Sequence, residues 1–145
     1  MKQKVIIEII SVLLILLFVY ASTSKLLNYA LFVTQLKASP FLSAFAPIIT
    51  WLLPMVELGI AVMLTVKNIR IIGFLLSFIL LLLFTIYIEM MLLSPVHLPC
   101  SCGGVLQALS WKQHLLFNLF FMALAATGAL LEKKKKTVSH FHKVA

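Results

Sequence analysis

Four long apolar runs, separated by shorter polar segments, dominate the hydropathy pattern of this 145-residue chain. About 20 helical residues span a hydrocarbon core that is roughly 30 Å thick, and each run reaches about that length. Backbone groups in lipid need partners within the protein, so each run is expected to be a helix. The pattern predicts membrane spans over Val5–Leu27, Pro47–Val66, Ile69–Leu93 and Trp111–Leu131.

The segment between the first two runs, residues 28–46, is half apolar with scattered polar residues. Leu31, Phe32 and Leu36 fall at helical spacing, which predicts an amphipathic helix lying at the membrane surface. Pro40 is expected to end that helix, because the residue before a proline disfavours helical geometry. This segment is therefore interpreted as a partly helical, interfacial connection.

Composition supports a membrane protein and excludes a soluble domain. The chain is 63% hydrophobic and only 11% charged, with a mean hydropathy of +1.14. A soluble fold of this size cannot cover so much apolar surface. We expect an all-α, four-helix transmembrane bundle, with one membrane domain over residues 1–132 and a basic cytoplasmic tail over 133–145.

The first run also has features of a signal peptide. Lys2 and Lys4 precede it, and Val19-Tyr20-Ala21 fits a small-residue cleavage rule. The apolar stretch is long for a signal peptide and contains Glu8. Cleavage after Ala21 is therefore the less favoured interpretation.

The distribution of Lys and Arg predicts the orientation, since cytoplasmic loops are enriched in both. With both ends of the chain inside, nine of the 12 basic residues lie inside and three outside. This predicts a multi-pass membrane protein with both ends in the cytoplasm, and its excess positive charge is expected to contact anionic lipid and not nucleic acid. The inner set is Lys2, Lys4, Lys67, Arg70, Lys133–Lys136 and Lys143; the outer set is Lys25, Lys37 and Lys112.

The two cysteines of the chain, Cys100 and Cys102, fall in a loop that this topology places outside the cytoplasm. Pro99 before them and Gly103-Gly104 after them favour a non-helical backbone, in which residues i and i+2 can approach. The small disulfide ring is strained, and a strained disulfide exchanges more readily than an ordinary one. The pair is the predicted catalytic site for thiol–disulfide exchange on the oxidising side of the membrane.

Other interpretations of the cysteines stay open. They can be structural or inert thiols, or sites of acylation. With His97 they supply three metal ligands, whereas a closed zinc site needs four, so no metal is predicted.

Polar residues inside the spans form a second constellation. Lys25, Glu57, Glu89 and Asn118 are all expected at or above the membrane centre, on the side of the cysteines. One hypothesis is a Lys25–Glu57 ion pair with Glu89 and Asn118 nearby, forming a polar pocket that moves protons or holds a quinone head group. The alternative is that Lys25 extends to the surface and Glu57 is protonated.

Four short motifs follow one another in the chain: Ala21-Ser22-x-x-Lys25-Leu26, Pro54-x-x-Glu57, Pro99-Cys100-x-Cys102-x-Gly104, and Trp111 with Asn118. Their order and spacing resemble the MauE branch of the DoxX/MauE integral membrane proteins over nearly the whole chain. Gly103 departs from the pattern, since the family usually has an aromatic residue there. The resemblance implies a four-helix inner-membrane protein linked to methylamine utilisation, or to periplasmic disulfide handling beside a thioredoxin-like partner.

Two classes of function follow. The first is a membrane redox protein whose cysteines exchange electrons or disulfides with a periplasmic thioredoxin-like protein. The second is a non-catalytic scaffold or assembly factor whose cysteines are structural.

Reporter fusions test the topology. The charge bias predicts cytoplasmic signals for fusions after Asn68 and after Lys136, and a periplasmic signal for a fusion after Gly104. Paired alkaline phosphatase and fluorescent-protein fusions measure each position from both sides. A cytoplasmic signal at Gly104 would contradict the redox hypothesis, because the cysteines would then face a reducing compartment.

Overall fold

The structure is a computed structural model that describes residues 2–144 except 94–109. Its elements are helices, and no strand occurs among the described residues. In chain order they are α1 (Lys2–Leu27), α2 (Tyr29–Ala38), the 3-10 turn η1 (Ser43–Phe45), α3 (Ala46–Thr65), α4 (Arg70–Leu93) and α5 (Trp111–Val144).

The predicted fold class is confirmed. Four segments are long and apolar enough to cross a membrane, and their lengths suit a lipid bilayer: Lys2–Leu27, Ser43–Thr65, Arg70–Leu93 and Lys112–Val138. The connection between the first two is partly helical, and α2 ends one residue before Ser39-Pro40. One difference concerns α5, which does not stop near residue 132 but continues through the lysine run to Val144.

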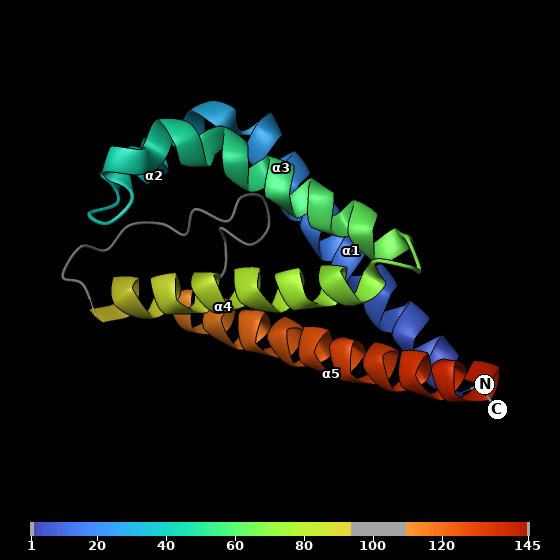
Figure 1. The fold of residues 1–145 in the computed structure, drawn as a ribbon. Coiled ribbons are helices and arrows are strands. Elements are labelled where there is room, and N and C mark those ends of the chain that lie inside the picture. The colour runs from blue at the N-terminus through green and yellow to red at the C-terminus, as the bar shows by residue number, and fades with distance from the viewer. Residues whose placement is uncertain (1, 94–109, 145) are drawn as a thin grey trace.

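The bundle consists of two helix pairs. α1 packs along α3, and α4 packs along α5. The pairs approach each other at the end that holds both termini and the α3–α4 connection, and they diverge toward the other end, where α2 lies (Figure 1).

A buried stripe on each helix explains the α1–α3 pairing. On α1 the stripe includes Leu14, Phe18, Ala21 and Lys25, at intervals of three or four residues. On α3 the buried positions recur at similar intervals: Ala46, Thr50, Pro54, Glu57, Ile60, Ala61 and Leu64. Residues at this spacing share one helix face, so the two stripes meet along their length. Many other apolar side chains of the two helices are exposed and available to contact lipid.

Polar contacts tie together the end that carries the termini, which we call the basic end (Lys2, Lys4, Lys67, Arg70 and Lys133–Lys136). The buried Arg70 donates from Nη1 to Glu8 Oε1 at 2.9 Å, which links α4 to α1. Lys136 Nζ donates to the carbonyl of Asn68 at 2.9 Å, which links α5 to the α3–α4 connection. Basic residues that are far apart in the sequence are thereby gathered on one side. The opposite end, where Leu93 and Ser110 flank the cysteine-bearing segment, is called the loop end.

Gly128 provides a test of the α4–α5 packing. A Cβ added there would lie 2.5 Å from the buried Phe74 ring, whereas a Cβ at Gly59 of α3 meets nothing within 4 Å. We expect Gly128→Ala to lower the free energy of unfolding by about 1–3 kcal/mol through overpacking. Gly59→Ala is the matched control and is expected to be neutral or stabilising, since alanine favours helix.

Thermal unfolding of both variants in one detergent measures the effect. Equal midpoints for Gly128→Ala and Gly59→Ala would show that α4 and α5 are not packed as described.

Candidate functional site

A buried ion pair joins the two helices of the first pair. Lys25 Nζ lies 2.7 Å from Glu57 Oε1, and the two side chains are 2% and 1% exposed. The ammonium also lies 3.4 Å from the carbonyl of Ala21 and 5.7 Å from the centre of the Phe84 ring on α4. Burying a charge inside a membrane bundle costs free energy unless the charge is paired. The Lys25 ammonium and the Glu57 carboxylate compensate each other's charge.

Local sequence explains why the two side chains meet. Lys25 follows Ala21 by four residues and Phe18 by seven, so it extends the buried stripe of α1. Glu57 lies near the middle of α3, three residues after Pro54 and on the same buried stripe. Pro54 lacks the N–H that would bond the carbonyl of Thr50, which leaves an extra acceptor in this part of α3.

Asn118 of α5 forms a second polar contact in the same region. Its amide nitrogen donates to the carbonyl of Leu81 and to Thr85 Oγ1, each at 2.8 Å, and so links α5 to α4. Ser110 sets the start of α5 through a reciprocal cap: Ser110 N donates to Gln113 Oε1, and Gln113 N lies 3.4 Å from Ser110 Oγ. This cap fixes the position of Asn118 two turns into the helix.

His114 also lies at this site, and the sequence analysis did not identify it. It is 3% exposed and occurs four residues before Asn118, on the same face of α5. The i, i+4 spacing of two polar residues at the start of an apolar helix was the available signal.

A cavity of about 30 Å³ connects these groups. Lys25, Glu57, His114 and Asn118 line it, together with apolar residues of α1, α4 and α5, including Phe84. Among the described residues, Glu57 Oε2 is buried with no hydrogen-bond partner. A cavity of this size with several polar groups has room for water, which would give that oxygen a donor.

The other predicted site residues are placed differently. Glu89 is exposed on α4 and is not part of the cavity lining, so the structure does not bring it to Lys25 and Glu57. Cys100 and Cys102 lie outside the described residues. Within the described ranges, no group of three or more His, Cys, Asp or Glu side chains could hold a metal ion.

The arrangement suits proton binding and hydrogen bonding more than covalent chemistry. It combines a paired ammonium and carboxylate, an imidazole and an amide, all shielded from solvent. The low dielectric constant of this buried site strengthens each electrostatic contact. It also raises the free-energy cost of a polar or charged group that loses its partner.

Comparison with known proteins gives one family. Residues 3–131 match the family model of "Methylamine utilisation protein MauE", which covers most of the chain. No curated protein and no solved structure shows significant similarity to it.

A double-mutant cycle tests the ion pair. Lys25→Met alone leaves a buried carboxylate without its partner, and we expect the free energy of unfolding to fall by about 3–5 kcal/mol. Adding Glu57→Leu removes the second charge and is expected to restore most of that loss. Lys37→Met, on the exposed face of α2, is the matched control and should change little.

Unfolding of all variants in the same detergent gives the coupling energy. A Lys25→Met variant as stable as Lys37→Met would contradict the buried pair.

Proposed function

Since the chain belongs to the MauE family of membrane proteins linked to methylamine utilisation, we propose that it acts in thiol–disulfide redox chemistry at the bacterial inner membrane. In this proposal, Cys100 and Cys102 form the redox couple and a periplasmic thioredoxin-like protein is the partner. The Lys25–Glu57 pair and its cavity lie inside the bundle, close to the end of α1 and the start of α5.

The proposed reaction is a thiol–disulfide exchange. A thiolate of one protein attacks a disulfide of the other, a mixed disulfide forms, and the second thiol of the attacking pair resolves it. One protein ends with a disulfide and the other with two thiols, so two electrons and two protons change hands. The direction depends on the relative reduction potentials of the two pairs.

The observation that carries the proposal is the position of the basic residues. They lie at the end of the bundle opposite to the ends of α4 and α5 that flank the cysteine-bearing connection. The last turn of α4 and the first turn of α5, which flank that connection, lie at the loop end (Figure 1). Arg70 at the start of α4 and Lys136 of α5 belong to the basic end, where they contact Glu8 and Asn68. The positive-inside rule favours a cytoplasmic basic end. The cysteines then belong to the oxidising side, where a disulfide persists.

The buried polar groups have a supporting role in this proposal. Thiol–disulfide chemistry releases or takes up protons as thiols and disulfides interconvert. Glu57 and His114 are ionisable groups within one cavity, so they can hold a proton in the bundle. Glu57→Gln keeps a hydrogen-bonding side chain at this position, and we expect it to impair function less than Glu57→Leu.

Trapping of mixed disulfides tests the proposal. In cells quenched with acid, wild-type thiols should resist alkylation until a reductant is added. In Cys100→Ser or Cys102→Ser, the remaining cysteine can still form a mixed disulfide, but the second thiol that would resolve it is missing. A covalent adduct with a thioredoxin-like protein should therefore accumulate. The double variant Cys100→Ser/Cys102→Ser is the control and should form no adduct.

Non-reducing gels and mass spectrometry identify the adducts. A wild-type pair that stays fully reduced, with no adduct in either single variant, would contradict the proposal and favour a non-catalytic membrane scaffold.

A further inference from the structure

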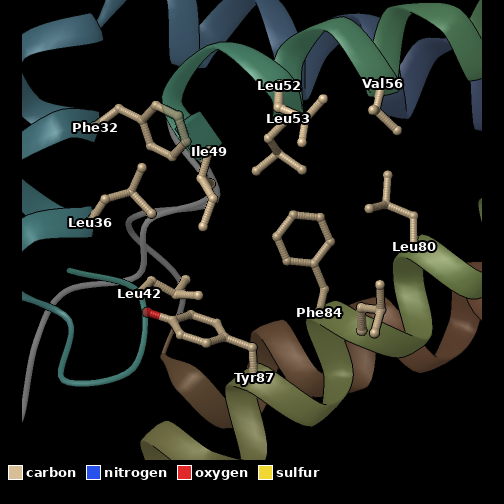
Figure 2. A pocket seen from close by; sticks show the side chains of 11 residues that line it. Phe32, Leu36, Leu42, Ile49, Leu52, Leu53, Val56, Leu80, Phe84 and Tyr87 are labelled. Carbon is tan, nitrogen blue, oxygen red and sulfur yellow. The ribbon is translucent and has the colours of Figure 1, made fainter. Parts of the chain in front are cut away.

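An apolar cleft of about 300 Å³ lies between α2, α3 and α4, outside the polar site described above. Figure 2 shows side chains from the three helices pointing toward one another around this space, with the Phe84 ring reaching from α4 toward Leu53 of α3. The cleft forms because α3 and α4 diverge from their short connection at the basic end. α2 closes it toward the loop end through Phe32 and Leu36.

The chemistry of the lining favours hydrocarbon. Among the described residues that line the cleft, only Tyr87 has a polar side-chain atom, and its hydroxyl donates to Ser39 Oγ at 3.2 Å. Leu52 and Leu83 line the cleft and are 56% and 58% exposed, so the cleft is open at its side. That side opens between two membrane-spanning helices, where the surrounding medium is lipid.

Phe84 separates this cleft from the polar cavity. It lines both spaces, and Lys25 Nζ lies 5.7 Å from the centre of its ring. Glu57 lines the polar cavity together with Phe84, and its buried Oε2 has no hydrogen-bond partner among the described residues. An apolar space that is open to lipid therefore adjoins a small polar space across one aromatic side chain.

We propose that the cleft binds the hydrocarbon tail of a membrane quinone, with the quinone ring at Phe84 next to the Lys25–Glu57 cavity. The ligand needs a long apolar part for the cleft and hydrogen-bonding atoms for the cavity. Its polar part has to be uncharged, because a charged phospholipid head group stays at the membrane surface and Glu57 lies near the middle of α3. A quinone ring with an isoprenoid tail meets these requirements.

This inference rests on the proposed function only for the role of the quinone as acceptor of electrons from the cysteines. Oxidation of the Cys100–Cys102 dithiol to a disulfide releases two electrons and two protons. Reduction of one quinone to a quinol consumes the same number of each. Binding of the quinone itself does not require the cysteines.

Photolabelling of the full chain in lipid nanodiscs tests the site. The probe is a ubiquinone analogue with a diazirine in its tail, and unlabelled short-tailed ubiquinone is the competitor. We expect saturable labelling of cleft residues such as Leu53 and Leu80, found by peptide mass spectrometry. Leu83→Trp places a large side chain in the cleft mouth and should reduce labelling by about tenfold, which corresponds to about 1.4 kcal/mol of binding free energy.

Leu75→Trp is the matched control. Leu75 is an exposed leucine of the same helix that does not line the cleft, so this variant should be labelled like the wild type. A phospholipid with a diazirine in one acyl chain is the second probe and distinguishes a specific site from general lipid contact.

Three results would overturn the inference. They are quinone labelling that does not saturate, equal labelling of Leu83→Trp and Leu75→Trp, or phospholipid labelling of the same residues that ubiquinone does not displace. The assay does not involve the cysteines, and the trapping experiment does not involve the quinone. Saturable labelling without mixed disulfides would therefore contradict the proposed function alone, and the reverse result would contradict this inference alone.

Discussion

The ion pair between Lys25 and Glu57 constrains the arrangement of the helices around it. In hydrocarbon neither charge is tolerated alone, so α1 and α3 have to stay in the register that joins Nζ to Oε1 at 2.7 Å. α2 connects the end of α1 to the start of α3, so this register also limits where α2 lies. Phe84 of α4 packs against the same ammonium, which brings the second helix pair into the contact.

Different kinds of polar contact stabilise the two ends of the bundle. At the basic end, Arg70 pairs with a half-exposed Glu8, and the exposed Lys136 bonds a backbone carbonyl. Because Glu8 and Lys136 are exposed to solvent, these two contacts are weaker and more sensitive to salt than fully buried ones. Near the loop end, the polar contacts of Lys25 and Asn118 are buried, so they are strong and depend on geometry. The helices diverge toward the loop end, and the apolar cleft results from that divergence.

The sequence predicts the spans, and it offers the Lys25–Glu57 ion pair as one of two alternatives, for physical reasons. Span length is set by the bilayer, and Lys25 and Glu57 are the deep charges of opposite sign in neighbouring spans. The position of Glu89 could not be predicted in this way, because α4 is apolar on all sides and its pattern does not show which face is buried. His114 lay outside the prediction, since a single histidine has no partner until α5 is placed against α1. The cleft depends on the angle between α3 and α4, and this angle cannot be predicted from the local hydropathy pattern of either helix.

The unbroken helix of α5 has a consequence for depth in the membrane. Successive residues in a helix are about 100° apart, so Lys133–Lys136 surround the helix with positive charge instead of forming one charged face. Such a ring is held at the level of the phosphate groups and resists movement of the helix along the membrane normal. Asn118 precedes the ring by 15 residues, or about 22 Å of helix rise. In a hydrocarbon layer of about 30 Å, the lysine ring thus fixes the polar cavity in the half of the membrane farther from the lysines.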